Sequence, residues 1–213
     1  MNPEPGNRPV LRASKLRSRT DPPPKGYKYT VALSDEASGG RLAHCDVCGQ
    51  LLHASQAIET ESGQRWSLSP NRRIMPSHWT LSDPNDRAVL VLDQRIFGKL
   101  VNPLTRAGMS IKNPQGAVVF RVVEPDASLP ERLLGPDPDA WAVEADDGPV
   151  ALIATLVKTD QPARGWRGKL QRFIRGADVG LVSLGEEHRF GVAESLAILM
   201  IFRELRDISK SVE

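Results

Sequence analysis

Apolar and polar residues alternate in short runs through the middle of the chain, and polar turns separate these runs. Three pairs of runs, each joined by a turn of Asn, Asp, Pro or Gly, are residues 79–81 with 88–92, 109–112 with 117–123, and 141–144 with 149–157. A further pair, residues 179–184 and 188–190, is joined by Gly185, Glu186 and Glu187. Strand, polar turn and strand in this order predict β-hairpins.

The hairpins recur at a nearly constant interval. Leu81, Ile111 and Val143 hold equivalent places in their units, and they follow one another at spacings of 30 and 32 residues. This interval indicates a weak internal repeat of hairpin units.

The C-terminal region has a different pattern. Residues 192–208 contain no Gly or Pro, and apolar residues cover nearly every side of a helix over about 193–203. A helix that is apolar all round is buried all round. It is shorter than the ~20 residues that cross a bilayer, so protein must enclose it. The sequence therefore predicts a mainly β (α+β) fold, in which an antiparallel sheet curls around one C-terminal helix at about 192–208.

Composition narrows the class of protein. The 213 residues are 40% hydrophobic and 25% charged, with 28 Lys and Arg against 26 Asp and Glu. These values exclude disorder of the whole chain, and two cysteines exclude a disulfide-stapled scaffold. No transmembrane span or secretory signal is expected, and a reducing cytoplasm fits the two cysteines. The nearly neutral net charge argues against nucleic-acid binding.

The N-terminal region is basic and rich in proline. Residues 1–30 hold seven Lys and Arg against Glu4 and Asp21. Few apolar residues offset the entropy of ordering, so residues 1–35 are predicted as a mobile arm. The arm would aid solubility, touch anionic lipid or nucleic acid, or bind a protein partner. Residues 36–60 are then a Cys-x-x-Cys knuckle or a first hairpin, and residues 61–213 form the barrel.

The runs at Ile111–Val123 and Trp141–Val157, with the segment Phe190–Phe202, resemble the tubby C-terminal-like barrel superfamily, in its LURP-one-related and phospholipid-scramblase-like branch. The resemblance covers roughly residues 60–208. It implies a closed β-barrel of about a dozen strands threaded by the final helix. It also implies association with membrane phospholipids or phosphoinositides, or an unassigned role, and enzymatic chemistry is not typical of the family. The scramblase branch has a Cys-rich stretch and an acidic calcium segment that this chain does not match, so calcium-activated scrambling is not implied.

A cysteine cluster offers one metal site. Cys45 and Cys48 form a Cys-x-x-Cys-Gly sequence, with His44 before it and His53 after it. Two thiolates at this spacing grip one face of a zinc ion, and a closed structural site needs four ligands. Cys45, Cys48 and His53 supply three, and His44 or His78 is the candidate fourth. The alternatives are a redox pair, or two reduced cysteines in a hairpin turn.

A basic stretch offers one anion site. Arg164, Arg167, Lys169, Arg172 and Arg175 have no acid among them, and Trp166, Leu170 and Phe173 are interleaved at helical spacing. A basic amphipathic segment with a Trp suits an anionic membrane surface. The alternative is a connecting segment whose apolar face packs on the barrel.

Catalytic motifs are not found. The sequence has no Gly-x-Ser-x-Gly, no phosphate-binding glycine loop and no His-Glu-x-x-His. The acidic residues between Glu124 and Asp147 lack the spacing of a calcium loop and fit a solvated loop. The sequence therefore favours a non-enzymatic, peripheral phospholipid- or phosphoinositide-binding module. The alternative is an interaction or scaffold protein with a small zinc knuckle near its N-terminus.

Overall fold

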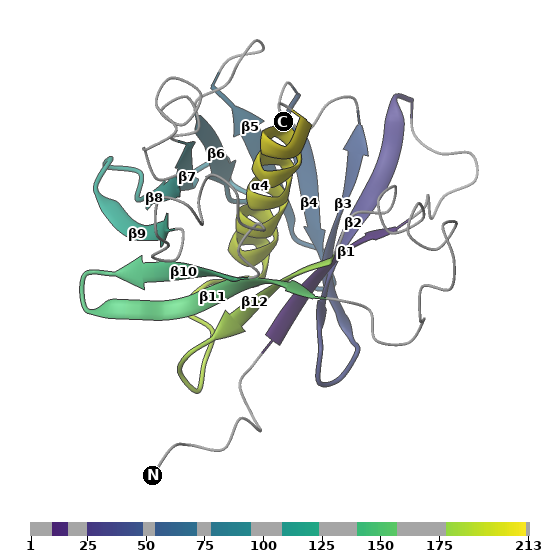
Figure 1. Cartoon of the computed structure of the whole chain (residues 1–213). Coiled ribbons are helices and arrows are strands. Elements are labelled where there is room, and N and C mark those ends of the chain that lie inside the picture. The colour runs from purple at the N-terminus through teal and green to yellow at the C-terminus, as the bar shows by residue number, and fades with distance from the viewer. Residues whose placement is uncertain are drawn as a thin grey trace.

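The structure of the chain is a computed structural model, and it describes residues 10–16, 25–48, 54–71, 78–94, 108–123, 140–156 and 178–211. Twelve strands and one helix are found in these residues (Figure 1). In chain order they are β1 (Val10–Leu16), β2 (Tyr27–Asp35), β3 (Arg41–Cys48), β4 (Gln56–Thr60), β5 (Arg65–Pro70), β6 (His78–Ser82), β7 (Ala88–Gln94), β8 (Gly108–Lys112), β9 (Val118–Val123), β10 (Ala140–Ala145), β11 (Gly148–Leu156), β12 (Asp178–Ser183) and α4 (Val192–Ser211).

The strands form one closed antiparallel barrel. Each strand pairs with its neighbours in sequence, and β1 pairs with β12 to close the ring. Closure leaves no exposed sheet edge on which a second chain could add a strand. The predicted fold class is thus confirmed, including its strand number and its C-terminal helix.

The prediction of a mobile arm over residues 1–35 is wrong for the two strands that the structure describes there. Residues Val10–Leu16 are β1, and Tyr27–Asp35 are β2, so the barrel begins at Val10 and not at residue 61. Leu11 and Ala13 point into the core from β1, which pairs with Val179–Val182 of β12. Only two apolar side chains face inward from this strand, so its pairing partners, and not its own composition, hold it in place.

Two of the three units of the predicted repeat share one turn geometry. In the β6–β7 turn, the Asp83 N–H donates to the Arg87 carbonyl, and the Asp86 N–H donates to the Asp83 carbonyl. The β8–β9 turn has the same two bonds, from the Asn113 N–H to the Ala117 carbonyl and from the Gly116 N–H to the Asn113 carbonyl. The fourth residue has a positive φ in each turn, 59° at Asp86 and 87° at Gly116. The hairpin at Val143 differs, because only two residues join β10 to β11.

The predicted hairpin after β12 is wrong. Residues 188–190 form no strand; they lead the chain into α4 instead. Phe190 is 6% exposed, and its ring stacks edge-on against Phe120 of β9, with centroids 4.6 Å apart. Phe190 therefore packs against the core from the segment that leads into the helix.

The helix fills the barrel. Leu196, Ala197, Ile198, Leu199 and Ile201 are each 0% exposed, because inward-facing strand residues surround them. Trp141 of β10 meets Phe202 edge-on at 5.3 Å. The interior is therefore a packed core, and a ligand must bind on the outside of the barrel or at one of its ends.

Candidate functional site

The connections at the two ends of the barrel differ in length. Since successive antiparallel strands run in opposite directions, alternate connections lie at opposite ends. One end holds the connections 36–40, 61–64, 83–87, 113–117, 146–147 and 184–191. The other end holds 17–26, 49–55, 71–77, 95–107, 124–139 and 157–177. We call these the tight-turn end and the long-connection end.

The sequences of the two sets of connections also differ in charge. The six tight-turn connections contain eight Asp and Glu against two Arg, whereas the six long connections contain fifteen Lys and Arg against seven Asp and Glu. The whole chain has a formal net charge of only +2. The nearly neutral total thus hides a difference in charge between two sets of connection sequences, and only the strand topology sorts the connections into these sets.

At the tight-turn end, acidic side chains serve the turns themselves. The Asp83 carboxylate accepts the amides of Asn85 and Arg87 at 2.8 and 2.9 Å. The Asp35 carboxylate accepts the Ser38 hydroxyl at 2.7 Å and the Ala37 amide at 3.1 Å. These hydrogen bonds stabilise the charged carboxylates and so lower the pKa of both groups. The largest contribution comes from the Ser38 hydroxyl for Asp35 and from the Arg87 amide for Asp83. Both carboxylates therefore stabilise the turns in which they lie.

His188 also lies at this end. Its Nδ1 is 2.6 Å from the hydroxyl of Ser183, which is 2% exposed. Burial lowers the pKa of His188 below its usual 6.5, and the nearby Asp35 partly opposes this shift. No hydrogen bond joins Asp35 to His188 among the described contacts, and Asp35 is already held by its turn. The arrangement therefore ties the last strand to the segment before α4.

A shallow groove lies near the same end, between β9 and β10. Its volume is about 140 Å³, and Phe120, Arg121, Glu144 and Asp146 are among its lining residues. Pockets that enclose a small molecule usually measure ~300–1,000 Å³. This groove is too small to hold a lipid.

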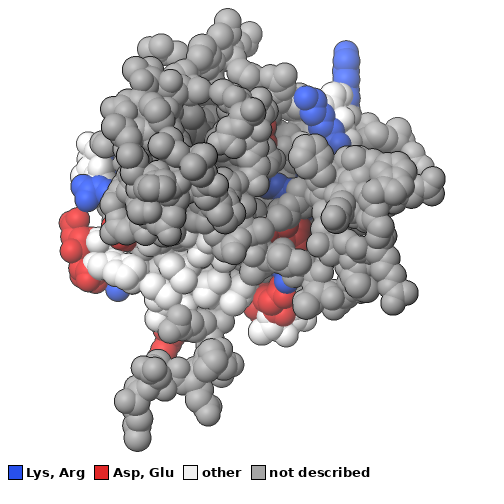
Figure 2. Space-filling view, in the orientation of Figure 1, with Lys and Arg blue, Asp and Glu red and all other residues white. Residues whose placement is uncertain are grey.

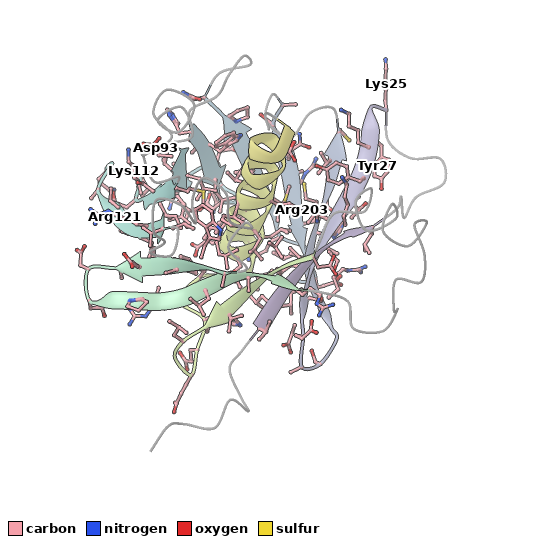
Figure 3. All side chains as sticks on the ribbon, viewed as in Figure 1. Lys25, Tyr27, Asp93, Lys112, Arg121 and Arg203 are labelled. Atoms are coloured by element: carbon pink, nitrogen blue, oxygen red, sulfur yellow. The ribbon has the colours of Figure 1, made fainter. Side chains whose placement is uncertain are left out.

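At the long-connection end, the described residues at the start of β2 and the end of β1 carry basic and aromatic side chains. Lys25 and Lys28 are exposed, and the two long blue side chains at the upper right of Figure 2 mark this region. The Lys15 ammonium sits 3.7 Å from the centroid of the Tyr29 ring. Figure 3 shows Lys25 and Tyr27 at the tip of β2. The three lysines were part of the predicted arm, and only the strand pairing brings them together.

The predicted zinc ligands do not form a knuckle. Residues 41–48 are one strand, so side chains alternate between its faces. Cys45 is 0% exposed inside the barrel, where burial raises the pKa of its thiol to about 12. The Cys48 side chain lies on the other face. The Cys48 N–H donates to the Gln56 side-chain oxygen, and the Gln56 side-chain amide donates to the Cys48 carbonyl, each at 3.1 Å. The two thiols therefore cannot share one ion while β3 is intact.

The histidines of the predicted site add no ligand in the described part of the chain. His44 faces outward, with its Nε2 3.7 Å from Glu59. His53 lies outside the described residues. No group of three His, Cys, Asp or Glu is arranged for a metal in the residues described. Zinc at Cys45 and Cys48 stays a prediction that the strand geometry disfavours.

The predicted anion-binding residues Arg164, Arg167, Lys169, Arg172 and Arg175 lie outside the described residues. The strands on either side are described, and β11 ends at Leu156 while β12 begins at Asp178. Both of these strand ends lie at the long-connection end. Within the described residues, no helix combines the length and apolar composition needed to cross a membrane.

Comparisons with known proteins give one distant likeness. No protein-family model matches the sequence, and no curated protein does. Among solved structures, an X-ray structure of a protein from Arabidopsis thaliana, AT5G01750, aligns over 94% of this chain and 91% of its own. The identity is 14% and the TM-score is 0.45, so the likeness carries no argument about function. The fold rests on the strand register of this chain itself.

Proposed function

We propose that this protein is a non-enzymatic, peripheral module that binds an anionic phospholipid surface through its long-connection end. The observation that carries the proposal is the charge difference between the two sets of connection sequences: fifteen basic against seven acidic residues in the long connections, and two basic against eight acidic residues in the tight turns. A charged surface turns such a molecule so that its basic end faces the negative lipid headgroups.

The basic segment between β11 and β12 is the strongest contributor in this proposal. Five of its residues are basic within the span 164–175, and each cation near an anionic membrane contributes about 1 kcal/mol. Its four arginines can also fork onto phosphate oxygens, which favours phosphorylated headgroups such as phosphoinositides. The packed interior supports binding at the headgroups, since α4 occupies the space that a carried lipid would need.

Vesicle cosedimentation tests the proposal. Wild-type protein is expected to pellet with phosphatidylcholine vesicles that contain phosphatidylserine or a phosphoinositide, and not with phosphatidylcholine alone. Replacing Arg164, Arg167 and Arg172 by Gln should weaken binding about a hundredfold, from about 1 kcal/mol per charge. High salt should have the same effect, because it screens exposed charges.

A matched variant controls for total charge. Arg65, Arg87 and Arg189 lie at the tight-turn end, and replacing them by Gln removes the same number of arginines. Binding by this control should stay close to that of wild-type protein. Equal loss in both triple variants would show that net charge, and not the basic end, drives adsorption; no wild-type binding to any anionic vesicle would reject the function.

A further inference from the structure

One exposed apolar side chain stands out at the long-connection end. Leu16, the last residue of β1, is 37% exposed, and it is the one exposed large hydrophobic side chain in the part of the chain that the structure describes. It pairs across the sheet with Thr30 of β2, two residues from Lys28. Lys15 precedes it, and Lys25 lies just before β2. We call Lys15, Leu16, Lys25 and Lys28 the β1–β2 rim.

Local contacts hold the rim in position. The Tyr27 hydroxyl is 3.1 Å from the Thr30 hydroxyl, which in turn donates to the Asp46 carboxylate of β3. Thr30 is 0% exposed, so this chain of bonds ties the start of β2 to its neighbour. On β1, Lys15 rests over the Tyr29 ring. These contacts hold the β1–β2 rim in place at the long-connection end, and Figure 3 shows Tyr27 and Lys25 at its tip.

We infer that the β1–β2 rim seats directly on an anionic bilayer, with Leu16 entering the interface between headgroups and acyl chains and Lys25 and Lys28 at the phosphates, while Lys15, on the inner face of β1, stays over the Tyr29 ring. This inference rests on the proposed function and assigns it a contact surface that is separate from residues 164–175. Long lysine side chains keep their charged heads at the headgroups while their stems lie against apolar matter. Tyrosines are enriched at the same depth, where a ring meets both phases.

The chemistry of the rim favours a bilayer over nucleic acid. Lysines alone would suit either partner, because both present phosphate. An exposed leucine gains free energy only where it leaves water, which the acyl region of a bilayer provides. The Asp46 carboxylate beside the rim accepts the Thr30 hydroxyl.

Site-directed labelling tests the placement of Leu16. An environment-sensitive fluorophore is attached in a Leu16→Cys variant that also carries Cys48→Ser; Cys45 stays, because it is 0% exposed. The control carries the label in Asn85→Cys, an exposed turn position at the tight-turn end, in the same background. On phosphatidylserine-containing vesicles, we expect a blue shift and quenching by spin-labelled acyl chains at position 16 and no change at position 85.

Unlabelled variants give a second measurement. Lys25→Gln with Lys28→Gln should weaken vesicle binding about 25-fold, at about fivefold per charge. Leu16→Ala should weaken it about fivefold, at any salt concentration. The matched control, Arg65→Gln with Arg87→Gln, should stay within about twofold of wild-type protein, because its charges lie beyond a Debye length from the bilayer. Circular dichroism confirms that each variant is folded.

The outcomes separate this inference from the function beneath it. Vesicle binding without a spectral change at position 16, or with equal changes at positions 16 and 85, overturns the rim placement and leaves the function standing. Unchanged binding by the Lys25/Lys28 double variant also overturns it. Absence of wild-type binding rejects both.

Discussion

The two ends of the barrel are built by different means. At the tight-turn end, backbone and side-chain hydrogen bonds within each turn define the path of the chain, as at Asp35, Asp83 and Asn113. At the long-connection end, the connections run to as many as the 21 residues of 157–177, and they hold most of the basic residues of the sequence. One end specifies the fold locally, and the other holds the candidate binding residues.

The comparison separates stability from function within one barrel. Short hydrogen-bonded turns fix strand register and lower the entropy cost of closing each hairpin. Binding residues commonly lie on connections that a rigid scaffold positions. Here the helix in the core joins both ends, and the predictions below probe each part in turn.

The largest effect is expected in the shared core. Leu199 of α4 is 0% exposed, and Leu199→Ala leaves a cavity in the centre of the barrel. The free energy of unfolding should fall by about 2.7–5 kcal/mol. Urea denaturation measures this change, and amide exchange should rise at both ends together. A loss confined to one end would show that α4 does not couple them.

A smaller effect is expected within a single tight turn. The Asn113 side chain accepts the Ala117 amide at 2.9 Å, and Asn113→Ala leaves that amide without this partner. Stability should fall by about 1 kcal/mol, the net contribution of one such bond. Lys25→Ala, an exposed change at the other end, should alter stability by less than about 0.5 kcal/mol. Equal losses of stability from the two substitutions would contradict the proposed difference between the ends.

The repeated turns provide a reciprocal pair of substitutions. Asp86 and Gly116 hold equivalent positions with φ of 59° and 87°. Asp86→Gly should raise the free energy of unfolding by up to about 1 kcal/mol, since glycine adopts positive φ without steric cost. Gly116→Ala should lower it by about 1 kcal/mol from backbone strain alone, because a Cβ there meets nothing within 4 Å. Thermal melts measure both, and effects of the same sign would contradict the equivalence.

A pH effect is expected from His188 at the tight-turn end. Burial depresses the folded-state pKa below the usual 6.5, so the unfolded chain binds more protons between the folded value and 6.5. Stability from this group is present above 6.5 and is lost as pH falls through that window. The His188→Gln variant should therefore lose less stability than wild-type protein on acidification. Identical pH profiles from thermal melts would show that His188 does not titrate on folding.

The smallest effects are expected in the thiol reactivity and zinc content of Cys45 and Cys48. Cys45 is buried with a pKa of about 12, so a thiol reagent should modify it only in denaturant. Protein purified without added zinc should carry none at Cys45 and Cys48, because the strand places them on opposite faces. Elemental analysis beside the Cys45→Ser/Cys48→Ser variant measures this. About one zinc per chain, lost in the variant, would restore the knuckle and require β3 to open.

Several elements were predictable because their signals are local. The hairpins around Asp83 and Asn113 combine alternating apolar residues with turn residues, and the helix is apolar on every side. From these, a curled sheet around a buried helix follows. By contrast, the sequence of β1 alone predicts part of a mobile arm, since its inward residues are only Leu11, Ala13 and Lys15. Its pairing with β12, from the far end of the chain, leaves no local trace.

The candidate site divides in the same way. The sequence by itself identified the cationic residues at 164–175 and the lysines near the N-terminus, because charge is a property of composition. Only the tertiary structure decided that Lys15, Lys25 and Lys28 share an edge with an exposed Leu16, and that acidic turns gather at the opposite end. It also placed Cys45 and Cys48 on opposite faces of β3. Hairpin turns and helix burial depend on residues that are neighbours in the sequence, so the sequence predicts them. The end at which each connection lies depends on how the strands pair around the closed barrel, which only the tertiary structure shows.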